Sequence, residues 1–440
     1  MSGFDSIKEY ESLLDIEECI RFYPPDIEEI NDADDIFDIK RKIALYIHIP
    51  FCKSPCGFCP FNQYNYDENM YDDYFNALEK EIQLIKEKID FSRILINSVW
   101  VGGGTPLDLN MQQLTKFLTI VCDSFEISNI LEFTIEGKPV EGMITNEKIE
   151  LLCKYGVTRI SLGVQSTNPK YLKLLGRNYT FEQVCDTIRR ITAYGLNLNL
   201  DMIYNIPGES MKEVIYDVKR IAALKAEHIS WFHYISHTGT PLTRKFNNER
   251  VNLKRNKEEF YKMYKMVHDI MSENGYNQYT PYYYTNGRQC QYHIDRWKMP
   301  QIDVLGLGAG AFSTFDGWIY TNAHTLDLYI DILSKGQLPI KVGKKISKED
   351  ENARYIVLGC KFFNISISEY KKITGIDIEK QYADEIKMLQ ELGLIEISSD
   401  FIKCTEKGQA FNNAVATGFS NKKYYKIGQP QPLLIRGEGL

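Results

Sequence analysis

Three cysteines stand close together in the segment HIPFCKSPCGFCPF, residues 48–61. Cys52, Cys56 and Cys59 form a C-x3-C-x2-C pattern in a stretch rich in turn-forming residues. A structural zinc site takes four protein ligands in a closed tetrahedron, and His48, at the end of an expected buried strand, would have to be the fourth. A 4Fe-4S cluster takes one ligand per iron, so three thiolates leave one iron open to a small molecule. The spacing therefore favours an iron–sulfur cluster, with a zinc site or buried thiols as the alternatives.

The composition is that of a large globular protein. The chain has 440 residues, 44% of them hydrophobic and 25% charged, which is enough to bury a large core. The formal net charge of -7 argues against a general nucleic-acid binder. The N-terminus has no basic region followed by an apolar run, and no stretch is apolar for long enough to span a bilayer. With the other seven cysteines scattered, disulfides are not expected. We predict a cytoplasmic protein without membrane or nucleic-acid partners.

Strand-like and helix-like segments alternate from about residue 41. Apolar runs rich in β-branched residues predict strands, and the amphipathic stretches between them predict helices. Six such repeats imply an α/β fold, in which a parallel sheet with helices outside it forms an open sheet or a full or partial barrel. The expected strands are 43–49, 98–101, 131–135, 159–164, 196–204 and 228–235.

The same patterns divide the chain into four parts. Residues 1–40 are acidic and irregular, and FYPP indicates an extended N-terminal arm. Residues 41–340 form the α/β core, which includes the glycine-rich segment VLGLGAGAFS. Residues 345–420 predict helices and a short hairpin that turns at 398–400, giving a small helical, winged-helix-like domain. Residues 421–440 form a tail.

The motifs along the chain resemble one family. C-x3-C-x2-C after a first strand looks like the signature of radical S-adenosylmethionine (SAM) enzymes. The wider set resembles the branch that contains oxygen-independent coproporphyrinogen III oxidase, and it includes YIHIPFC, GGGTP, TIEGKP, RISLGVQS, GRNYTFEQV, LNLDMIYNIPGES and LGLGAGAFS. The resemblance covers roughly residues 41–415. It implies a partial (β/α)6 barrel that holds one 4Fe-4S cluster on the three cysteines.

The resemblance also implies roles for residues at the ends of the expected strands, where ligands gather in parallel α/β folds. In this family the open iron binds the amino and carboxylate groups of SAM, and electron transfer cleaves SAM to a 5'-deoxyadenosyl radical. Tyr46 and Gln165 are implied at the reacting centre, Arg177 on the SAM carboxylate and Asp201 on the ribose. The other implied SAM-binding positions are Gly102, Gly103, Gly104, Thr105, Glu136, Ile203 and Ile235, the two isoleucines at a second SAM.

Residue type alone allows plainer interpretations of these positions. Glu136 and Asp201 could be ordinary carboxylates at strand ends, and Arg177 a solvated helix charge. The glycine run could be a tight turn, Tyr46 a core tyrosine, and the two isoleucines plain core.

The segment after the third cysteine departs from the oxidase, which typically carries another cysteine where this chain has Phe61. CGFCPFNQY instead resembles class C radical SAM methyltransferases and the related enzymes that open heme anaerobically. The heme-chaperone branch typically carries H-N-x-x-Y-W, and its counterpart here is YHIDRW, with Trp297 retained and His293 as a possible iron ligand.

These similarities imply a methyltransferase that uses two SAM molecules on a flat conjugated substrate, such as an aromatic compound or a heme-like tetrapyrrole. The oxidase and the heme chaperone are the alternatives. An electron donor such as flavodoxin or ferredoxin is implied as a partner.

Overall fold

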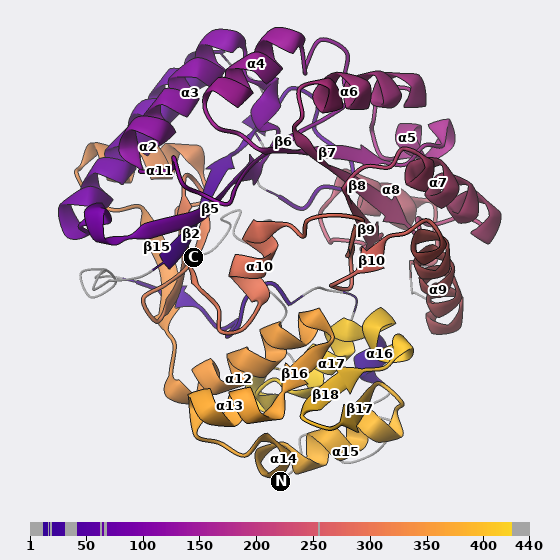
Figure 1. Cartoon of the computed structure of the whole chain (residues 1–440). Helices are drawn as coiled ribbons and strands as arrows, with labels where there is room; N and C mark the ends of the chain where they lie inside the picture. The colour runs from indigo at the N-terminus through magenta and orange to yellow at the C-terminus, as the bar shows by residue number, and fades with distance from the viewer. Residues whose placement is uncertain are drawn as a thin grey trace.

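The computed structural model describes residues 12–15, 17, 20–30, 42–61, 64–65, 68–253 and 256–424. This part of the chain contains a sheet of 13 strands in the order β1-β15-β14-β13-β12-β2-β5-β6-β7-β8-β9-β11-β10. In Figure 1 the strands curve around an open centre with helices outside them, and the C-terminal segment forms a second body below. Within the described ranges, no helix is both long enough and apolar enough to cross a membrane.

Six neighbouring parallel strands form the centre of the sheet, which confirms the predicted α/β repeats. Each pairs with the next in chain order; Tyr46, for example, lies opposite Trp100. The strands are β2 (Lys42–Ile49), β5 (Leu95–Gly103), β6 (Glu132–Gly137), β7 (Arg159–Gln165), β8 (Asn197–Tyr204) and β9 (His228–His233).

Helices cross over between these strands on the outer face. Three of them begin with a capping box, in which Asn110, Thr180 or Ser210 exchanges hydrogen bonds with the residue three positions on. Gly156 and Gly195 follow two of the helices with φ of +78° and +74°, as expected for residues that end helices. The helices of this body are α2 (Glu68–Lys88), α3 (Met111–Ser124), α4 (Asn146–Lys154), α5 (Pro169–Leu174), α6 (Phe181–Ala193), α7 (Met211–Ala223), α8 (Pro241–Asn248), α9 (Lys257–Glu273) and α11 (Leu326–Ser334).

Further strands of two to six residues extend the sheet on both sides, and the sequence analysis did not predict them. β12 pairs in parallel with β2, whereas the strands beyond it and beyond β9 are antiparallel. The glycine-rich segment supplies β12 and the turn after it. Gly308 is needed in that turn, because its φ is +98° and a Cβ would lie 2.4 Å from the Tyr74 hydroxyl. The added strands are β1 (Glu28–Glu29), β10 (Asn277–Gln278), β11 (Tyr283–Thr285), β12 (Asp303–Leu307), β13 (Phe312–Phe315), β14 (Trp318–Asn322) and β15 (Ile340–Lys345).

A short helix, α10 (Gln291–Trp297), lies in the open centre of the strands (Figure 1). Its Asp295 accepts hydrogen bonds from Asn97 Nδ2 and Ser98 Oγ of β5, each at 2.6 Å. Tyr292 packs in one apolar cluster with Trp100. The helix therefore fills part of the interior and presents its side chains to the strands.

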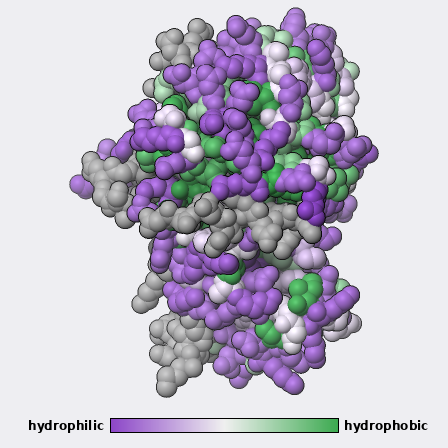
Figure 2. All heavy atoms as spheres, turned by 90° about the vertical axis from the view of Figure 1, so that its left-hand side faces the viewer, coloured by the Kyte–Doolittle hydropathy of each residue, from purple (hydrophilic) through white to green (hydrophobic). Residues whose placement is uncertain are grey.

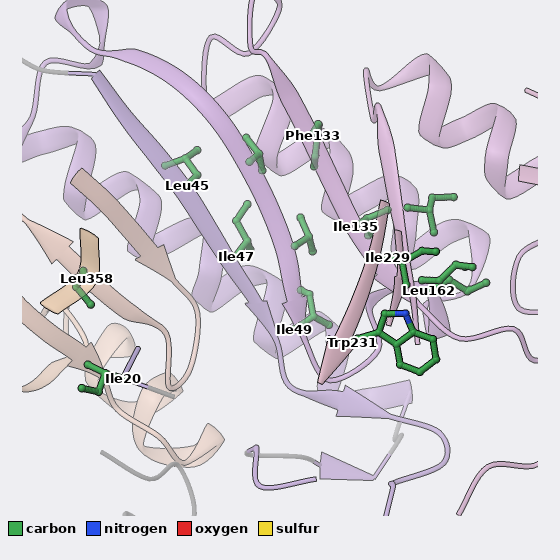
Figure 3. Close-up of a cluster of buried hydrophobic side chains, with 14 of the residues drawn as sticks. Ile20, Leu45, Ile47, Ile49, Phe133, Ile135, Leu162, Ile229, Trp231 and Leu358 are labelled. Atoms are coloured by element: carbon green, nitrogen blue, oxygen red, sulfur yellow. The ribbon is translucent and has the colours of Figure 1, made fainter. Parts of the chain in front are cut away.

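Side chains alternate between the two faces of each strand, as the pleat requires. Figure 3 shows Leu45, Ile47 and Ile49 of β2 in the same buried cluster as side chains of β6 and β9. Ala44 and Tyr46, which alternate with these residues along β2, belong instead to the interior cluster around α10. One set of alternate residues packs into the main hydrophobic core, and the other set faces α10 in the open centre of the strands.

The C-terminal body combines helices with a three-stranded sheet, and its predicted hairpin is confirmed by β17 and β18. Seen from the left of Figure 1, hydrophilic side chains cover most of this lower body, whereas apolar side chains gather within the upper one (Figure 2). Its elements are α12 (Lys348–Gly359), β16 (Asn364–Ser366), α13 (Ile367–Thr374), α14 (Ile378–Gln381), α15 (Ala383–Glu391), β17 (Ile395–Ser398), β18 (Phe401–Cys404), α16 (Glu406–Ala410) and α17 (Asn412–Gly418).

Candidate active site

A cavity of about 440 Å³ opens at the carboxyl ends of the parallel strands, a volume within the range of roughly 300–1,000 Å³ typical of small-molecule sites. It brings together all the residues that the sequence placed at a cluster or at SAM except Gly102. They are Tyr46, Cys52, Cys56, Cys59, Gly103, Gly104, Thr105, Glu136, Gln165, Arg177, Asp201, Ile203 and Ile235.

The loop that carries the three cysteines is tied to three other parts of the site. Lys53 N donates to Asp108 Oδ2 at 2.9 Å, and Lys138 Nζ donates to the Ser54 carbonyl at 2.9 Å. Gly57 O accepts from Leu242 N at 2.8 Å. Because backbone groups make these bonds, the side chains of the cysteines stay available for ligation.

The three thiols of the loop line one cavity. In the part of the chain that the structure describes, no three His, Cys, Asp or Glu side chains converge closely enough to hold one metal ion. The three cysteines nevertheless line one cavity, with Cys52 Sγ 3.3 Å from Thr105 Oγ1. Burial raises the pKa of the Cys52 thiol, and it raises that of Cys59 to about 12. A cluster needs separate thiolates, each on its own iron, and its positive charge favours the deprotonated form.

Two carboxylates, Glu136 and Asp201, lie across the cavity on inward-facing positions of β6 and β8. Glu136 Oε1 accepts from Trp100 Nε1 at 2.7 Å. Asp201 accepts from Ser161 Oγ at 2.9 Å and from Asn199 Nδ2 at 2.8 Å. Burial raises the pKa of both carboxyl groups, that of Glu136 to about 7. These fixed oxygens can accept hydrogen bonds from the hydroxyl or amino groups of a ligand.

We predict a pH-dependent stability change on replacing Glu136 by glutamine. Folding raises the pKa of Glu136 from 4.5 to about 7, so ionisation opposes folding, and stability present below pH 4.5 is lost as the pH rises through 7. Glutamine stays neutral and still accepts from Trp100. The advantage of Glu136→Gln over the wild type should therefore grow between pH 5 and 8, by about 1 kcal/mol or more. Thermal unfolding midpoints measure it. The exposed Glu79→Gln is the control, and parallel profiles for Glu136→Gln and wild type would contradict the prediction.

Gln165 ends β7 in a strained backbone conformation. Its φ is +69°, and the pairing of β7 with β8 shifts register between Gly163 and Gln165. A non-glycine residue in the left-handed region costs energy and is found often at functional sites. The shift lets the buried Gln165 side chain line the cavity, and its Nε2 passes so close to Gly163 that a Cβ there would lie 3.0 Å away.

Arg177 presents a buried cation to the cavity. Its side chain is only 8% exposed, and its Nε and Nη1 atoms find no hydrogen-bond partner among the described residues. Its guanidinium lies 5.5 Å from the ring centre of Phe58, in the cysteine loop. A buried guanidinium without partners is costly, and a bidentate carboxylate would satisfy it.

The glycine run packs closely inside the fold. A Cβ on Gly102 would lie 2.5 Å from Glu136 Oε1, one on Gly103 2.5 Å from the His48 ring, and one on Gly104 2.4 Å from the Phe51 carbonyl. The amides of Gly104 and Thr105 donate to backbone carbonyls of the cysteine segment at 2.7 and 2.8 Å. The amides are thus used within the fold. A ligand amino group, being a donor, would need the carbonyl groups of this run.

An aromatic wall lines another part of the cavity. The His293 ring stacks on Tyr283 with centroids 4.1 Å apart and on Trp297 at 5.3 Å. The interplanar angles are 12° and 8°. Phe232 and Tyr282 also line this region. The sequence singled out His293 and Trp297 but gave no reason to expect the tyrosines beside them.

The N-terminal arm reaches the cavity, which the sequence did not predict. Phe22 stacks on Phe312 with centroids 4.3 Å apart, and the Arg296 guanidinium lies 4.7 Å from the Phe22 ring centre. Arg21 lies 5.3 Å from the ring centre of Phe61, the residue that replaces the oxidase cysteine. Both arginines therefore border the cavity beside aromatic rings.

Comparison with known proteins agrees with this geometry. The radical SAM superfamily domain matches residues 46–221, and the HemN C-terminal domain matches residues 346–411. The chain is 28% identical over 380 residues to heme chaperone HemW of Bacillus subtilis, covering 86% of this chain and 98% of that protein. It is 29% identical over 387 residues to HemW of Lactococcus lactis, covering 87% and 98%. The solved structure of Escherichia coli coproporphyrinogen III oxidase (HemN), described as a radical SAM enzyme, superposes with a TM-score of 0.76 at 21% identity, covering 94% of this chain and 93% of that one.

The fold and the two domain matches place the chain in the radical SAM superfamily. Within that superfamily it belongs to the HemN-like branch, as the C-terminal domain and the HemW relatives show. The superfamily implies a 4Fe-4S cluster and SAM. The residues present fit both groups, since three thiols line one cavity together with Arg177, whose Nε and Nη1 have no hydrogen-bond partner among the described residues and could bind an anion.

Proposed function

We propose that this chain is a radical SAM enzyme that remodels a flat, acidic tetrapyrrole of the heme type. The observation that carries the proposal is a single cavity that joins the three cysteines and Arg177 to an aromatic wall. The cysteine end suits a cluster and SAM, and the aromatic wall suits a conjugated substrate. Both partners of a reaction are therefore held within one site.

At the cysteine end, Cys52, Cys56 and Cys59 would hold the cluster and the Arg177 guanidinium the SAM carboxylate. The Asp201 carboxylate, oriented by Ser161 and Asn199, would accept from ribose hydroxyls. When bound, the cluster and SAM supply one-electron chemistry and a transferable methyl group. The fold around them limits access of water, because the side chain of Cys52 is only 3% exposed and that of Cys56 only 8%.

At the other end, ring stacking and charge support the choice of substrate. The parallel rings of Tyr283, His293 and Trp297 make a surface that a flat conjugated molecule can contact. Arg21 and Arg296 border the same cavity, and planar guanidinium groups favour carboxylates. A tetrapyrrole with carboxylate side chains fits these groups better than a neutral heteroaromatic compound.

The reaction we propose is transfer of a carbon from a second SAM molecule. Ile203 and Ile235 line the cavity and would provide an apolar contact for that molecule. Phe61 and the aromatic segment after Cys59 support this reaction over oxidative decarboxylation, because the oxidase typically carries a cysteine in place of Phe61. Holding donor and acceptor in one pocket is what makes such a transfer fast.

The proposal is tested by turnover with SAM labelled at the methyl carbon. The cluster-loaded chain is incubated anaerobically with dithionite, labelled SAM and either heme or coproporphyrinogen III, and the products are analysed by mass spectrometry. We expect 5'-deoxyadenosine together with a labelled tetrapyrrole, because one SAM is reduced and a second donates carbon. An unlabelled, decarboxylated porphyrin would instead identify an oxidase.

A heme chaperone is the second candidate, and one specific observation favours it. Both HemW relatives described above carry that name and align over 98% of their own length. In the same experiment this candidate predicts tight heme binding with no tetrapyrrole product. The chaperone candidate binds the same class of molecule as the proposed enzyme but does not convert it to a product.

The electron source and the compartment follow from the cluster. We propose a small reductant such as flavodoxin or ferredoxin as the physiological donor, because SAM cleavage in this superfamily requires an electron. Free cysteines, nine of them among the described residues, agree with the reducing cytosol.

A further inference from the structure

Five histidines line the cavity, and four of them have partners that fix their rings. His48 Nδ1 lies 2.9 Å from the Tyr46 hydroxyl, and His233 Nε2 lies 3.2 Å from the Glu17 carbonyl. His293 is stacked in the aromatic wall, and His324 Nε2 lies 3.4 Å from Thr321 Oγ1. The fifth is His237. Across the ranges that the structure covers, no hydrogen bond or ring contact engages the His237 imidazole.

The backbone around His237 is nevertheless well anchored. His237 follows β9, and its carbonyl accepts from Thr240 N at 3.3 Å and from Thr240 Oγ1 at 3.0 Å. Helix α8 begins next, and its Leu242 N donates to the carbonyl of Gly57 in the cysteine loop. The loop is thus fixed at both ends, while the imidazole that it carries into the cavity has no hydrogen-bond partner among the residues that the structure describes.

We infer that His237 is an axial ligand for the iron of a metallotetrapyrrole bound in this cavity. The inference rests on the proposed tetrapyrrole substrate. It adds that an imidazole nitrogen of His237 binds the iron of that substrate. Iron in a porphyrin accepts a neutral imidazole nitrogen. The ring is half-buried beside Arg21, so an iron ligand and a group suited to carboxylates lie on the same side of the cavity.

The electrostatics of the loop agree with metal ligation. Burial, with a smaller contribution from the Arg21 charge, lowers the pKa of His237 to about 4. The imidazole is therefore neutral at pH 7 and keeps a lone pair free for iron. A role as a proton donor at that pH is correspondingly disfavoured.

His293 is the competing ligand, since it also lines the cavity. Its ring stacks on Tyr283 and on Trp297, and its side chain is 8% exposed. Its Nδ1 also has no hydrogen-bond partner among the described residues, so the two histidines differ in their ring contacts. These stacking contacts hold the His293 ring in place within the aromatic wall. An iron ligand has to turn one ring edge to the metal, and the His237 ring has no contact that opposes this.

The test compares iron protoporphyrin with metal-free protoporphyrin, which share size, planarity and carboxylates. Both are titrated into the cluster-loaded full chain without SAM, and the ferric heme signal is followed by electron paramagnetic resonance. His237→Ala should weaken binding of the iron porphyrin by about tenfold or more and leave binding of the metal-free porphyrin unchanged. Added imidazole should restore the ferric signal. His237→Met, which offers a thioether, should retain iron porphyrin binding with an altered signal.

Controls separate this inference from the proposed function. His268→Ala, outside the cavity, should behave as the wild type. The inference is overturned if His237→Ala weakens both porphyrins equally or neither, or if His293→Ala alone changes the ferric signal. In each of those cases the tetrapyrrole substrate still stands. If the wild type binds neither porphyrin, the proposed substrate fails and the inference fails with it.

Discussion

Replacing any one of Cys52, Cys56 and Cys59 by alanine is expected to abolish the iron–sulfur cluster and, with it, SAM cleavage. Each thiolate is predicted to hold a different iron, so the loss of one leaves a second iron without a protein ligand. Cys52 and Cys56 are buried in a loop that is tied to neighbouring segments, and no other described cysteine lines the cavity to replace a lost ligand. Iron and sulfide analysis after anaerobic reconstitution measures the effect against about four of each per wild-type chain.

Cysteines elsewhere in the fold provide matched controls. Cys153 is exposed on α4 and Cys185 is half-buried on α6, and neither lines the cavity. Alanine at either position should leave iron and sulfide content unchanged. A Cys52→Ala/Cys56→Ala double variant that still binds about four irons would show that the cluster lies elsewhere, and it would remove the basis of the proposed function.

Strand periodicity explains why so much of the site could be predicted. Tyr46, Glu136 and Asp201 lie on the interior faces of β2, β6 and β8, whereas neighbours such as Ile47 and Ile135 lie in the outer core. A period of two fixes that division once the strands are known, and parallel strands bring their carboxyl ends to one edge. The three cysteines could be recognised as a cluster site from their spacing alone, without knowledge of the fold.

The rest of the site depends on contacts between distant segments. Phe22 lies in the cavity because it stacks on Phe312, and α10 lies in the interior because Asp295 is bonded to Asn97 and Ser98. Nothing in the local pattern of either segment indicates its partner. Among the added strands, β1 and β10 have only two residues each, which carry too little periodicity to be recognised.

Arg177 also shows what a sequence motif leaves open. A helix-flanking arginine is usually solvated, and the resemblance alone gave it a role on the SAM carboxylate. The structure adds a physical reason, because the guanidinium is buried and its Nε and Nη1 have no hydrogen-bond partner in the described ranges. A buried charge without hydrogen-bond partners lowers the stability of the folded protein unless an anion is bound to it. Its effects on stability and on binding should therefore have opposite signs.

Arg177→Ala is expected to weaken SAM binding by roughly ten- to a hundredfold, since a charge-assisted hydrogen bond contributes about 1.5–3 kcal/mol. The same change should not destabilise the SAM-free protein, because it removes a buried charge with two nitrogens that no described residue satisfies. Anaerobic calorimetry of SAM binding and thermal unfolding without SAM measure the two effects on one preparation of cluster-loaded protein. The exposed Arg189→Ala on α6 is the control and should leave SAM affinity unchanged.

Unchanged SAM affinity in Arg177→Ala would remove Arg177 from the site. A marked loss of stability without SAM would mean that the guanidinium serves the fold rather than the ligand.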